Sequence, residues 1–219
     1  MTTQATIRIF IVEDHPIVRD GYELLLASED GIELCGFASK EQDALDGMRR
    51  TKPDVAIIDL QLDNGGSGLE LIEQVKNEIP SVRMLVVSAS DESLFAERAI
   101  AAGALGYLSK TSGSQSLVEA IRQVSQGEIV LSPESSNRVL KARLGHNKKS
   151  VGDVSSLTNR EIQIFRLLGE GDRSAVIAEK LLISQRTVER HCENIKQKLN
   201  LPSGRELLRR ATLWLQVNQ

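Results

Sequence analysis

The sequence lacks the features that would place a protein in a membrane or outside the cell. None of its apolar runs approaches the roughly 20 residues that a membrane-spanning helix needs. The N-terminus MTTQATIRIF has no basic stretch followed by an apolar segment, so we expect no secretory signal. The cysteines, Cys35 and Cys192, form no disulfide framework and match no zinc-binding spacing. We expect two buried thiols in a reducing cytoplasm.

The net charge of the chain is −3, but the charges are distributed unevenly along the sequence. Residues 1–130 hold 11 Lys and Arg against 21 Asp and Glu, which is a net charge of −10. Residues 131–150 hold 5 against 1, and residues 151–219 hold 11 against 8. The back part of the chain could therefore meet a polyanion, and the front part could not. The length is about enough for two small domains.

The front part alternates short apolar runs with helix-like stretches. The apolar runs are IRIFIV (7–12), IELCGFA (32–38), VAIIDL (55–60), RMLVVS (83–88) and ALGYLS (104–109). The helix-like stretches are PIVRDGYELLLAS, KEQDALDGMRR, GLELIEQVKNE, ESLFAERAIAA and SQSLVEAIRQVSQ. Runs rich in Ile and Val are typical of parallel strands that are covered on both faces. The alternation predicts an α/β domain over residues 1–128, with a five-stranded doubly wound parallel sheet.

The remaining chain predicts a linker and a second, all-α domain. Residues 129–153 are rich in Ser, Asn, Gly and Lys and predict a linker with a short helix at 134–144. Residues 154–219 have only helical periodicity, with capping signals at Thr158 and Ser184. Four short helices with tight connections predict a small bundle. The LISQ turn predicts a helix-turn-helix, whose second helix can enter a major groove.

Side chains suited to phosphoryl chemistry fall at the predicted strand ends. They are Glu13 and Asp14, Asp59, Ser88 and Lys110. In a doubly wound sheet, function collects at the carboxyl ends of the strands. Carboxylates placed close together repel one another unless a hard cation such as Mg²⁺ balances them, and a lysine beside them can hold an anion. Each residue alone is ordinary for a loop or a helix cap, but the set predicts phosphoryl transfer with Asp59 as candidate nucleophile.

The segments IVEDHPIVRDG, VAIIDLQL, MLVVSAS and GALGYLSK together resemble the receiver domain of two-component response regulators, over about residues 5–127. The resemblance implies that Asp59 is the phosphoacceptor and that Lys110 contacts the phosphoryl group. It implies a switch made of the Ser88 hydroxyl and the Tyr107 ring, which turns inward. It also implies a Mg²⁺ site formed by Glu13, Asp14, Asp59 and the backbone carbonyl of Gln61.

The loop after the phosphoacceptor departs from the receiver pattern. A Met-Pro-Gly-like turn is usual there, whereas LQLDNGGSG (60–68) lacks proline and is one residue longer. The metal geometry at Gln61 and the lifetime of the phosphoryl group therefore stay open. Hydrolases of the haloacid dehalogenase type are a rival interpretation. They usually carry an acid/base Asp two residues after the nucleophile, where this chain has Gln61. We therefore expect no enzyme acting on external substrates.

The stretch from LTNRE to KLNL, followed by RELLRRA, resembles the LuxR-type helix-turn-helix of the NarL/FixJ class, over about residues 155–217. GEIVLSPE (127–134) is similar to that class's entry to the linker. The two resemblances imply a cytoplasmic transcription regulator that is controlled by phosphorylation. Its partners would be a histidine kinase, promoter DNA and, on activation, a second copy of the chain. We expect the unphosphorylated receiver to mask residues 185–199. The alternative is a regulator that works without phosphorylation or through a protein partner.

The predicted recognition helix, RTVERHCENIKQKL (186–199), carries conflicting charges. The expected DNA-binding residues are Arg173, Ser184, Arg186, Thr187, Glu189, Arg190, Glu193, Lys196 and Lys198. Glu189 and Glu193 stand where the class often has basic residues, and the turn at 173–176 lacks a usual basic residue.

Three interpretations of this helix stay open. In the first, the helix reads DNA through its basic residues, and the glutamates accept hydrogen bonds from cytosine N4 or orient the arginines. In the second, they form a solvated face, in which Glu189 pairs with Arg186 and Glu193 pairs with Lys196. In the third, the domain binds protein. His191 is either a DNA contact or a packing residue. The last helix should present Leu207, Leu208, Ala211 and Leu215 on roughly one face, as core or as a dimer contact.

Overall fold

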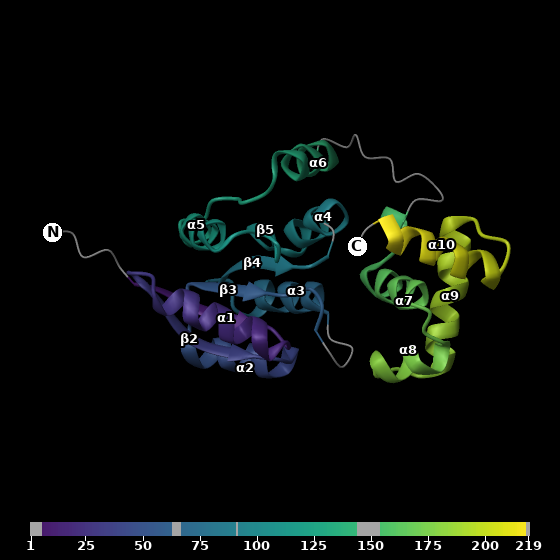
Figure 1. The fold of residues 1–219 in the computed structure, drawn as a ribbon, viewed down its shortest axis with the longest axis horizontal. Helices are drawn as coiled ribbons and strands as arrows, with labels where there is room; N and C mark the ends of the chain where they lie inside the picture. The colour runs from purple at the N-terminus through teal and green to yellow at the C-terminus, as the bar shows by residue number, and fades with distance from the viewer. Residues whose placement is uncertain (1–5, 63–66, 91, 144–153, 218–219) are drawn as a thin grey trace. The chain divides into compact units, whose positions relative to one another are not determined.

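The computed structural model describes residues 6–62, 67–90, 92–143 and 154–217 (Figure 1). The chain divides into two compact units, residues 1–140 and residues 141–219, and each is described by itself. In the described part of the chain, no helix combines the length and the apolar character needed to cross a membrane.

The first unit is built around a parallel sheet of five strands in the order β2-β1-β3-β4-β5. The strands are β1 (Ile7–Val12), β2 (Ile32–Ala38), β3 (Val55–Ile58), β4 (Arg83–Ser88) and β5 (Gly106–Ser109). The helices between and after them are α1 (Pro16–Ala27), α2 (Glu41–Thr51), α3 (Gly68–Glu78), α4 (Glu92–Ala102) and α5 (Ser114–Ser125). This arrangement confirms the predicted doubly wound fold.

Alternating side chains of each central strand enter two separate cores, one on each face of the sheet. In β1, Ile9 and Ile11 pack with residues of α1 and α5, whereas Phe10 and Val12 pack with residues of α2, α3 and α4. Because both faces of β1, β3 and β4 are covered, these strands are almost continuously apolar in sequence. The polar side chains of the candidate site therefore lie where the strands end.

The segment after α5 stays attached to the first unit. Val130 forms a parallel bridge with Gly106 of β5, and α6 (Pro133–Arg143) follows. The helix α6 lies within the segment predicted to be a linker. The boundaries of that linker, 129 and 153, stay predictions, and residues 144–153 lie outside the described residues.

From residue 154 to residue 217, the part that the structure describes after α6, the second unit consists of a short 3-10 turn, η1 (Val154–Ser156), and four helices. These are α7 (Asn159–Gly169), α8 (Ser174–Lys180), α9 (Gln185–Leu199) and α10 (Gly204–Val217). A capping box formed by Thr158 and Glu161 begins α7, and the Ser184 side chain caps α9 by accepting from the Thr187 amide. The predicted N-caps and the predicted number of helices are confirmed.

The last helix is partly buried as predicted, and one expectation about the cysteines is wrong. On α10, Leu207 and Ala211 are buried, whereas Leu208 is 46% exposed, so the alternative of a dimer contact stays open there. Cys35 and Cys192 are free thiols, as expected, but both are half-buried rather than buried.

Candidate functional site

The carboxyl ends of β1 and β3 bring three acidic side chains together. Glu13 and Asp14 follow β1 directly, and Asp59 follows β3. Glu13 and Asp59 are 1% and 3% exposed, respectively. Oxygen atoms of all three, together with a ring nitrogen of His15, lie within 4.8 Å of one another. The predicted meeting of strand-end carboxylates is therefore present in the structure.

Lys110, which follows β5, lies between two of these carboxylates. Its Nζ atom is 2.7 Å from Asp59 Oδ2 and 2.7 Å from Glu13 Oε2. Burial lowers the pKa of Lys110, but the charge of Asp59 and the hydrogen bonds to both carboxylates outweigh this effect and raise the pKa above its ordinary value. Lys110 therefore remains a cation beside the Asp59 carboxylate.

Asp59 is held at both oxygens. Its Oδ1 atom accepts from Ser88 Oγ at 2.7 Å and from the Gln61 backbone amide at 3.2 Å, and its Oδ2 atom accepts from Lys110. Ser88 ends β4 and is completely buried. The hydroxyl, the ammonium and the carboxylate that were expected to act together are thus in direct contact.

Ser90 links several of these groups and was missed in the sequence. Its hydroxyl accepts from Gln61 Nε2 at 2.8 Å and lies 3.3 Å from Ser88 Oγ. Its backbone carbonyl accepts from the Tyr107 hydroxyl at 2.7 Å. Tyr107 is 1% exposed, so its ring is buried in the fold. A serine in a loop gives no sequence signal of such a role.

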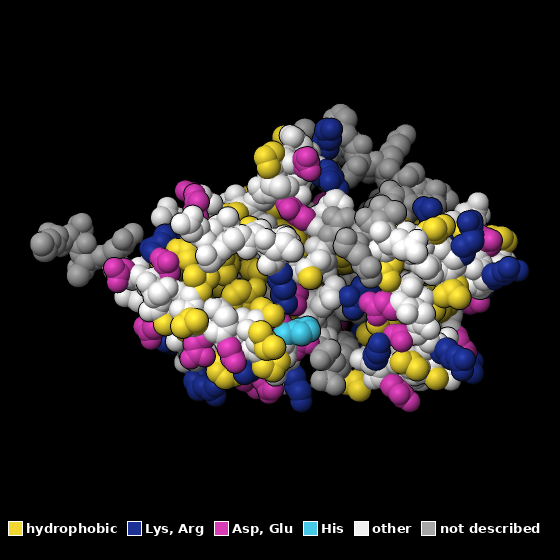
Figure 2. Space-filling view, viewed as in Figure 1, with side chains coloured by type: hydrophobic (Ala, Val, Ile, Leu, Met, Phe, Trp, Pro, Cys, Tyr) yellow, Lys and Arg dark blue, Asp and Glu magenta, His cyan; other side chains and the backbone are white. Residues whose placement is uncertain are grey.

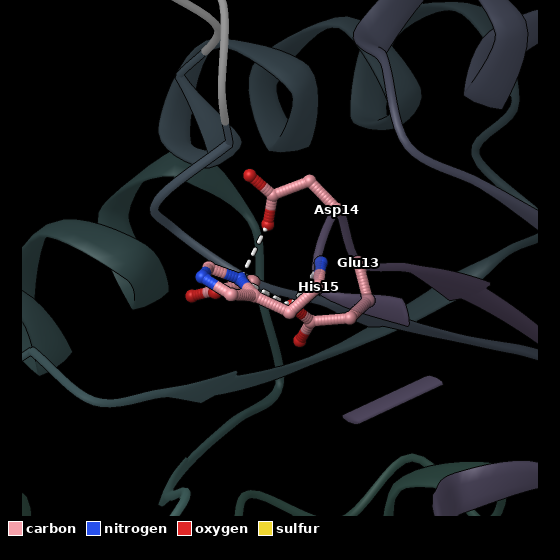
Figure 3. Close-up of side chains that lie close together, drawn as sticks. Glu13, Asp14 and His15 are labelled. Atoms are coloured by element: carbon pink, nitrogen blue, oxygen red, sulfur yellow. Dashed lines mark hydrogen bonds and ion pairs between the residues drawn. The ribbon is translucent and has the colours of Figure 1, made fainter. Parts of the chain in front are cut away.

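His15 is a second residue that the sequence did not indicate. Figure 3 shows its ring against Asp14 and Glu13, with Nδ1 at 2.9 Å from Asp14 Oδ1 and 3.1 Å from Glu13 Oε1. The charge of Asp14 is the main reason why the pKa of His15 is raised. A cationic ring is thus favoured beside the acidic cluster.

The donor set fits a hard divalent cation. Three carboxylates from two neighbouring strand ends supply the oxygen ligands that Mg²⁺ prefers. The fourth expected ligand, the carbonyl of Gln61, belongs to the loop whose departure from the usual pattern was noted above. Residues 63–66 of that loop lie outside the described residues.

In the second unit, α9 has one apolar face and one charged face. Val188, Ile195 and Leu199 are buried, and Cys192 is half-buried. The other face exposes Arg186, Glu189, Arg190, Glu193 and Gln197. The predicted amphipathic helix is therefore present. On the side of the molecule drawn in Figure 2, basic and acidic side chains are intermingled rather than gathered by sign.

Two of the four basic residues of α9 that were expected to face DNA are engaged in ion pairs. Lys198 Nζ lies 2.6 Å from Glu161 Oε2, and Lys196 Nζ lies 2.8 Å from Glu193 Oε1. Among the described residues, neither Arg186 nor Arg190 forms an ion pair.

One of the two expected glutamate pairs is replaced by another contact. The pair of Glu193 with Lys196 is present. The expected pair of Glu189 with Arg186 is absent among the described residues, because Glu189 Oε1 instead accepts from Gln185 Nε2 at 2.9 Å.

The other candidates near α9 differ in their contacts. Arg173 is the exposed N-cap of α8. The hydroxyls of Ser184 and Thr187 lie 2.8 Å apart at the start of α9. His191 is half-buried, and its Nδ1 atom is buried with no hydrogen-bond partner among the described residues. Burial is the main reason why the pKa of His191 is lowered, so a neutral ring is favoured there.

Both units match known protein families. Residues 9–122 match the family described as the response regulator receiver domain, and residues 155–211 match the bacterial regulatory proteins of the luxR family. The chain belongs to the response regulator family. Like other response regulators of the NarL/FixJ class, it is a phosphorylation-dependent, DNA-binding regulator of transcription.

Relatives extend over nearly the whole chain. The chain is 34% identical over 202 residues to the response regulator GacA of Pseudomonas aeruginosa, with 92% of this chain and 93% of that protein covered. It is 31% identical over 205 residues to the oxygen regulatory protein NreC of Staphylococcus carnosus, with 92% and 94% covered.

Among solved structures, the RcsB response regulator of Salmonella typhimurium matches with a TM-score of 0.70 and 22% identity, over 95% of this chain and 98% of that one. At this identity the likeness shows the fold alone.

Proposed function

We propose that Asp59 is the residue of this response regulator that accepts the phosphoryl group. The observation that carries the proposal is the position of its carboxylate, which lies 2.7 Å from both the Lys110 ammonium and the Ser88 hydroxyl. A carboxylate oxygen of Asp59 forms a bond to phosphorus while the bond between phosphorus and the donor's nitrogen or oxygen breaks. Lys110 neutralises charge on the transferred group throughout this step.

We propose that Glu13, Asp14, Asp59 and the carbonyl of Gln61 hold Mg²⁺. When bound, the cation offsets the repulsion between the carboxylates and the incoming phosphoryl oxygens. After transfer, the Ser88 hydroxyl donates to a phosphoryl oxygen in place of Asp59 Oδ1. Tyr107 keeps the space behind Ser88 filled. Transfer to the chain itself completes the role of this site, and we propose no activity on an external substrate.

The test is phosphoryl labelling of full-length protein by a labelled small-molecule donor in the presence of Mg²⁺. Asp59→Asn should abolish the label, because an amide is a far weaker nucleophile than a carboxylate. Asp20→Asn is the matched control: Asp20 has a 69% exposed side chain on α1 and should label as the wild type does. Retained labelling of Asp59→Asn would refute the assignment.

We propose a histidine kinase as the phosphodonor, acting in the cytoplasm. A cavity of about 260 Å³ lies between α1 and α5, and its lining includes Val18, Tyr22, Leu108 and Lys110. Beside it on α1, Ile17 and Leu24 are 87% and 78% exposed. An apolar surface that opens next to Lys110 suits a protein that delivers a phosphoryl group to Asp59.

We propose that α9 reads promoter DNA. Arg186 and Arg190 supply cationic contacts, and the exposed carboxylates of Glu189 and Glu193 accept from base amino groups such as cytosine N4. Arg173, Ser184 and Thr187 contact the phosphate backbone of the DNA near the start of α9. Lys196 reaches phosphate when it leaves Glu193. Lys198 contributes least, because it is held by Glu161. RcsB has been solved on the promoter rprA with the phosphomimetic BeF3−.

Phosphorylation is proposed to change both the accessibility of α9 and the association of two copies. In the unphosphorylated protein the receiver masks residues 185–199, and phosphorylation of Asp59 frees them and favours a homodimer. Two copies of α9 would then contact two half-sites about one helical turn of DNA apart. A regulator that works without phosphorylation is the alternative, and the complete Asp59 site disfavours it.

A further inference from the structure

The segment that leaves the receiver is attached to the edge of its sheet. Val130 O accepts from the Tyr107 amide at 2.9 Å, and the Val130 amide donates to Leu105 O at 2.9 Å. β5 is an edge strand, so this pairing satisfies backbone groups that would otherwise be open. A Cβ atom at Gly106 would lie only 3.1 Å from Val130 O. Glycine at this position therefore permits the close approach.

A second attachment joins the same segment to the first turn of α4. The Ser132 amide donates to Glu92 Oε1 at 3.0 Å, and Arg138 Nη1 donates to Ser93 O at 2.7 Å. The intervening Ser135 is 3% exposed. The segment from Ser132 to Arg138, which includes the start of α6, is thus held against α4 at two points. We call these contacts of Val130, Ser132 and Arg138 the linker clamp.

The two elements that hold the linker clamp also meet beside Asp59. Tyr107 donates through its backbone to Val130 and through its hydroxyl to Ser90 O. The Ser90 amide donates to Ser88 Oγ at 3.3 Å, and Ser88 Oγ donates to Asp59. Ser90 lies two residues before Glu92. One route of hydrogen bonds therefore runs from Asp59 through Ser88, Ser90 and Tyr107 to Val130. The second attachment, at Glu92, is close to Ser90 in sequence only.

We propose that the linker clamp is the output contact of the receiver, and that Glu92 and Arg138 are the positioning residues that couple it to Asp59. This inference rests on the proposed phosphorylation of Asp59. When the Ser88 hydroxyl turns to a phosphoryl group, Ser90 and Tyr107 lose their present partners or shift with them. The pairing at Val130 and the contacts at α4 then change together, and the linker that leads to the second unit is repositioned.

Hydrogen exchange on the full-length protein without phosphodonor tests the coupling itself. In the double variant Glu92→Ala with Arg138→Ala, exchange of the Tyr107 and Val130 amides should speed up at least about fivefold, because both belong to one cooperative contact. Glu92→Gln keeps an oxygen acceptor for the Ser132 amide and should exchange like the wild type. Lys141→Ala removes an exposed charge from the same helix, α6, and should also have no effect. Unchanged exchange in the double variant would overturn the proposal.

DNA affinity with and without beryllofluoride and Mg²⁺ tests the output role. The ratio of the two affinities should exceed about tenfold in the wild type and in Lys141→Ala, and fall to within about twofold of unity in the double variant. Phosphoryl labelling of Asp59 should persist in all three proteins. An unchanged ratio in the double variant, with labelling retained, would overturn the output role. If the wild type takes no label, the assignment of Asp59 as phosphoacceptor is refuted instead. The hydrogen-exchange experiment, which needs no phosphodonor, would still test the coupling between the contacts at α4 and the pairing at Val130.

Discussion

Glu161 is a buried charge on which the second unit depends. The side chain is 2% exposed, accepts from the Thr158 amide at 2.7 Å and pairs with Lys198. Burial alone would raise the pKa of Glu161, but Lys198 and Thr158 outweigh it and hold the pKa below its ordinary value of 4.5. The carboxylate therefore contributes stability above about pH 4.5, and this contribution is lost as the pH falls through the lowered pKa.

We predict that Lys198→Met destabilises the second unit at pH 7 by about 2 kcal/mol. This is less than a fully buried pair would cost, because the Lys198 side chain is 36% exposed. The loss should shrink as the pH falls toward the lowered pKa of Glu161 and vanish below it, where the carboxyl is neutral in both proteins. Trp214, which packs on Phe165 with ring centroids 5.5 Å apart and is the only tryptophan, reports unfolding of this unit by fluorescence.

Lys180→Met is the matched control for the Lys198 variant. Lys180 pairs with Asp172 at 2.8 Å, but its side chain is 50% exposed, and such pairs contribute at most about 1 kcal/mol. A Lys198→Met loss no larger than that of Lys180→Met, or one independent of pH, would contradict the role assigned to Glu161.

Single residues were predictable where a strand end fixed their position. Asp59, Ser88 and Lys110 each follow or end a strand of one parallel sheet, so their meeting follows from topology. Ser90 and His15 were not predictable, because their roles depend on which rotamer and which loop path bring them to a partner. The ion pair of Lys198 with the buried Glu161 was only weakly indicated by the sequence. Lys198 lies three residues after the buried Ile195, which places it near the buried face of α9.

At the scale of one element, α9 carries two glutamates with different partners. Glu193 holds Lys196, whereas Glu189 is bonded to the neutral Gln185. We predict that Glu193→Gln releases Lys196 to a phosphate and steepens the dependence of log K on log salt by about 0.9. Glu189→Gln should leave this slope unchanged, because it releases no cation. Fluorescence anisotropy with one duplex over a series of salt concentrations measures both, and equal slopes for the two variants would contradict the assigned pairs.

The start of α3 restricts the backbone at Asp59. A Cβ atom at Gly68 would collide with the backbone carbonyl of Asp59, whereas the same addition at Gly113, before α5, meets open space. We predict that Gly68→Ala costs about 1–3 kcal/mol of receiver stability and slows phosphoryl labelling of Asp59. Gly113→Ala should change neither. Thermal unfolding and labelling rates measure the two effects, and wild-type labelling by Gly68→Ala would contradict this close packing.

Elements as such were predictable because their periodicity is strong. The strands β1, β3 and β4 face two cores, and their continuous apolar runs are typical of parallel strands that are covered on both faces. The capping residues Thr158 and Ser184 located two helix starts. The attachment of Val130 to β5 could not be read from sequence, because a single bridge leaves no alternation to detect.

At the scale of the whole molecule, an acidic receiver precedes a DNA-binding unit, and the helix proposed to read DNA, α9, carries mixed charge. Two of the basic side chains on that helix are engaged by glutamates. Affinity for the phosphate backbone should therefore be modest. On the proposed mechanism, specific recognition then requires base contacts and two copies of α9, and phosphorylation supplies them by favouring the homodimer.

The most direct test is selection from a random DNA pool by full-length protein, with and without beryllofluoride and Mg²⁺. The account predicts that one sequence motif is enriched only with the phosphoryl mimic. It also predicts that the motif loses a base preference in Glu189→Gln or Glu193→Gln. Equal enrichment in both conditions, or none in either when the mimic is shown to bind at Asp59, would contradict a phosphorylation-gated reader of DNA.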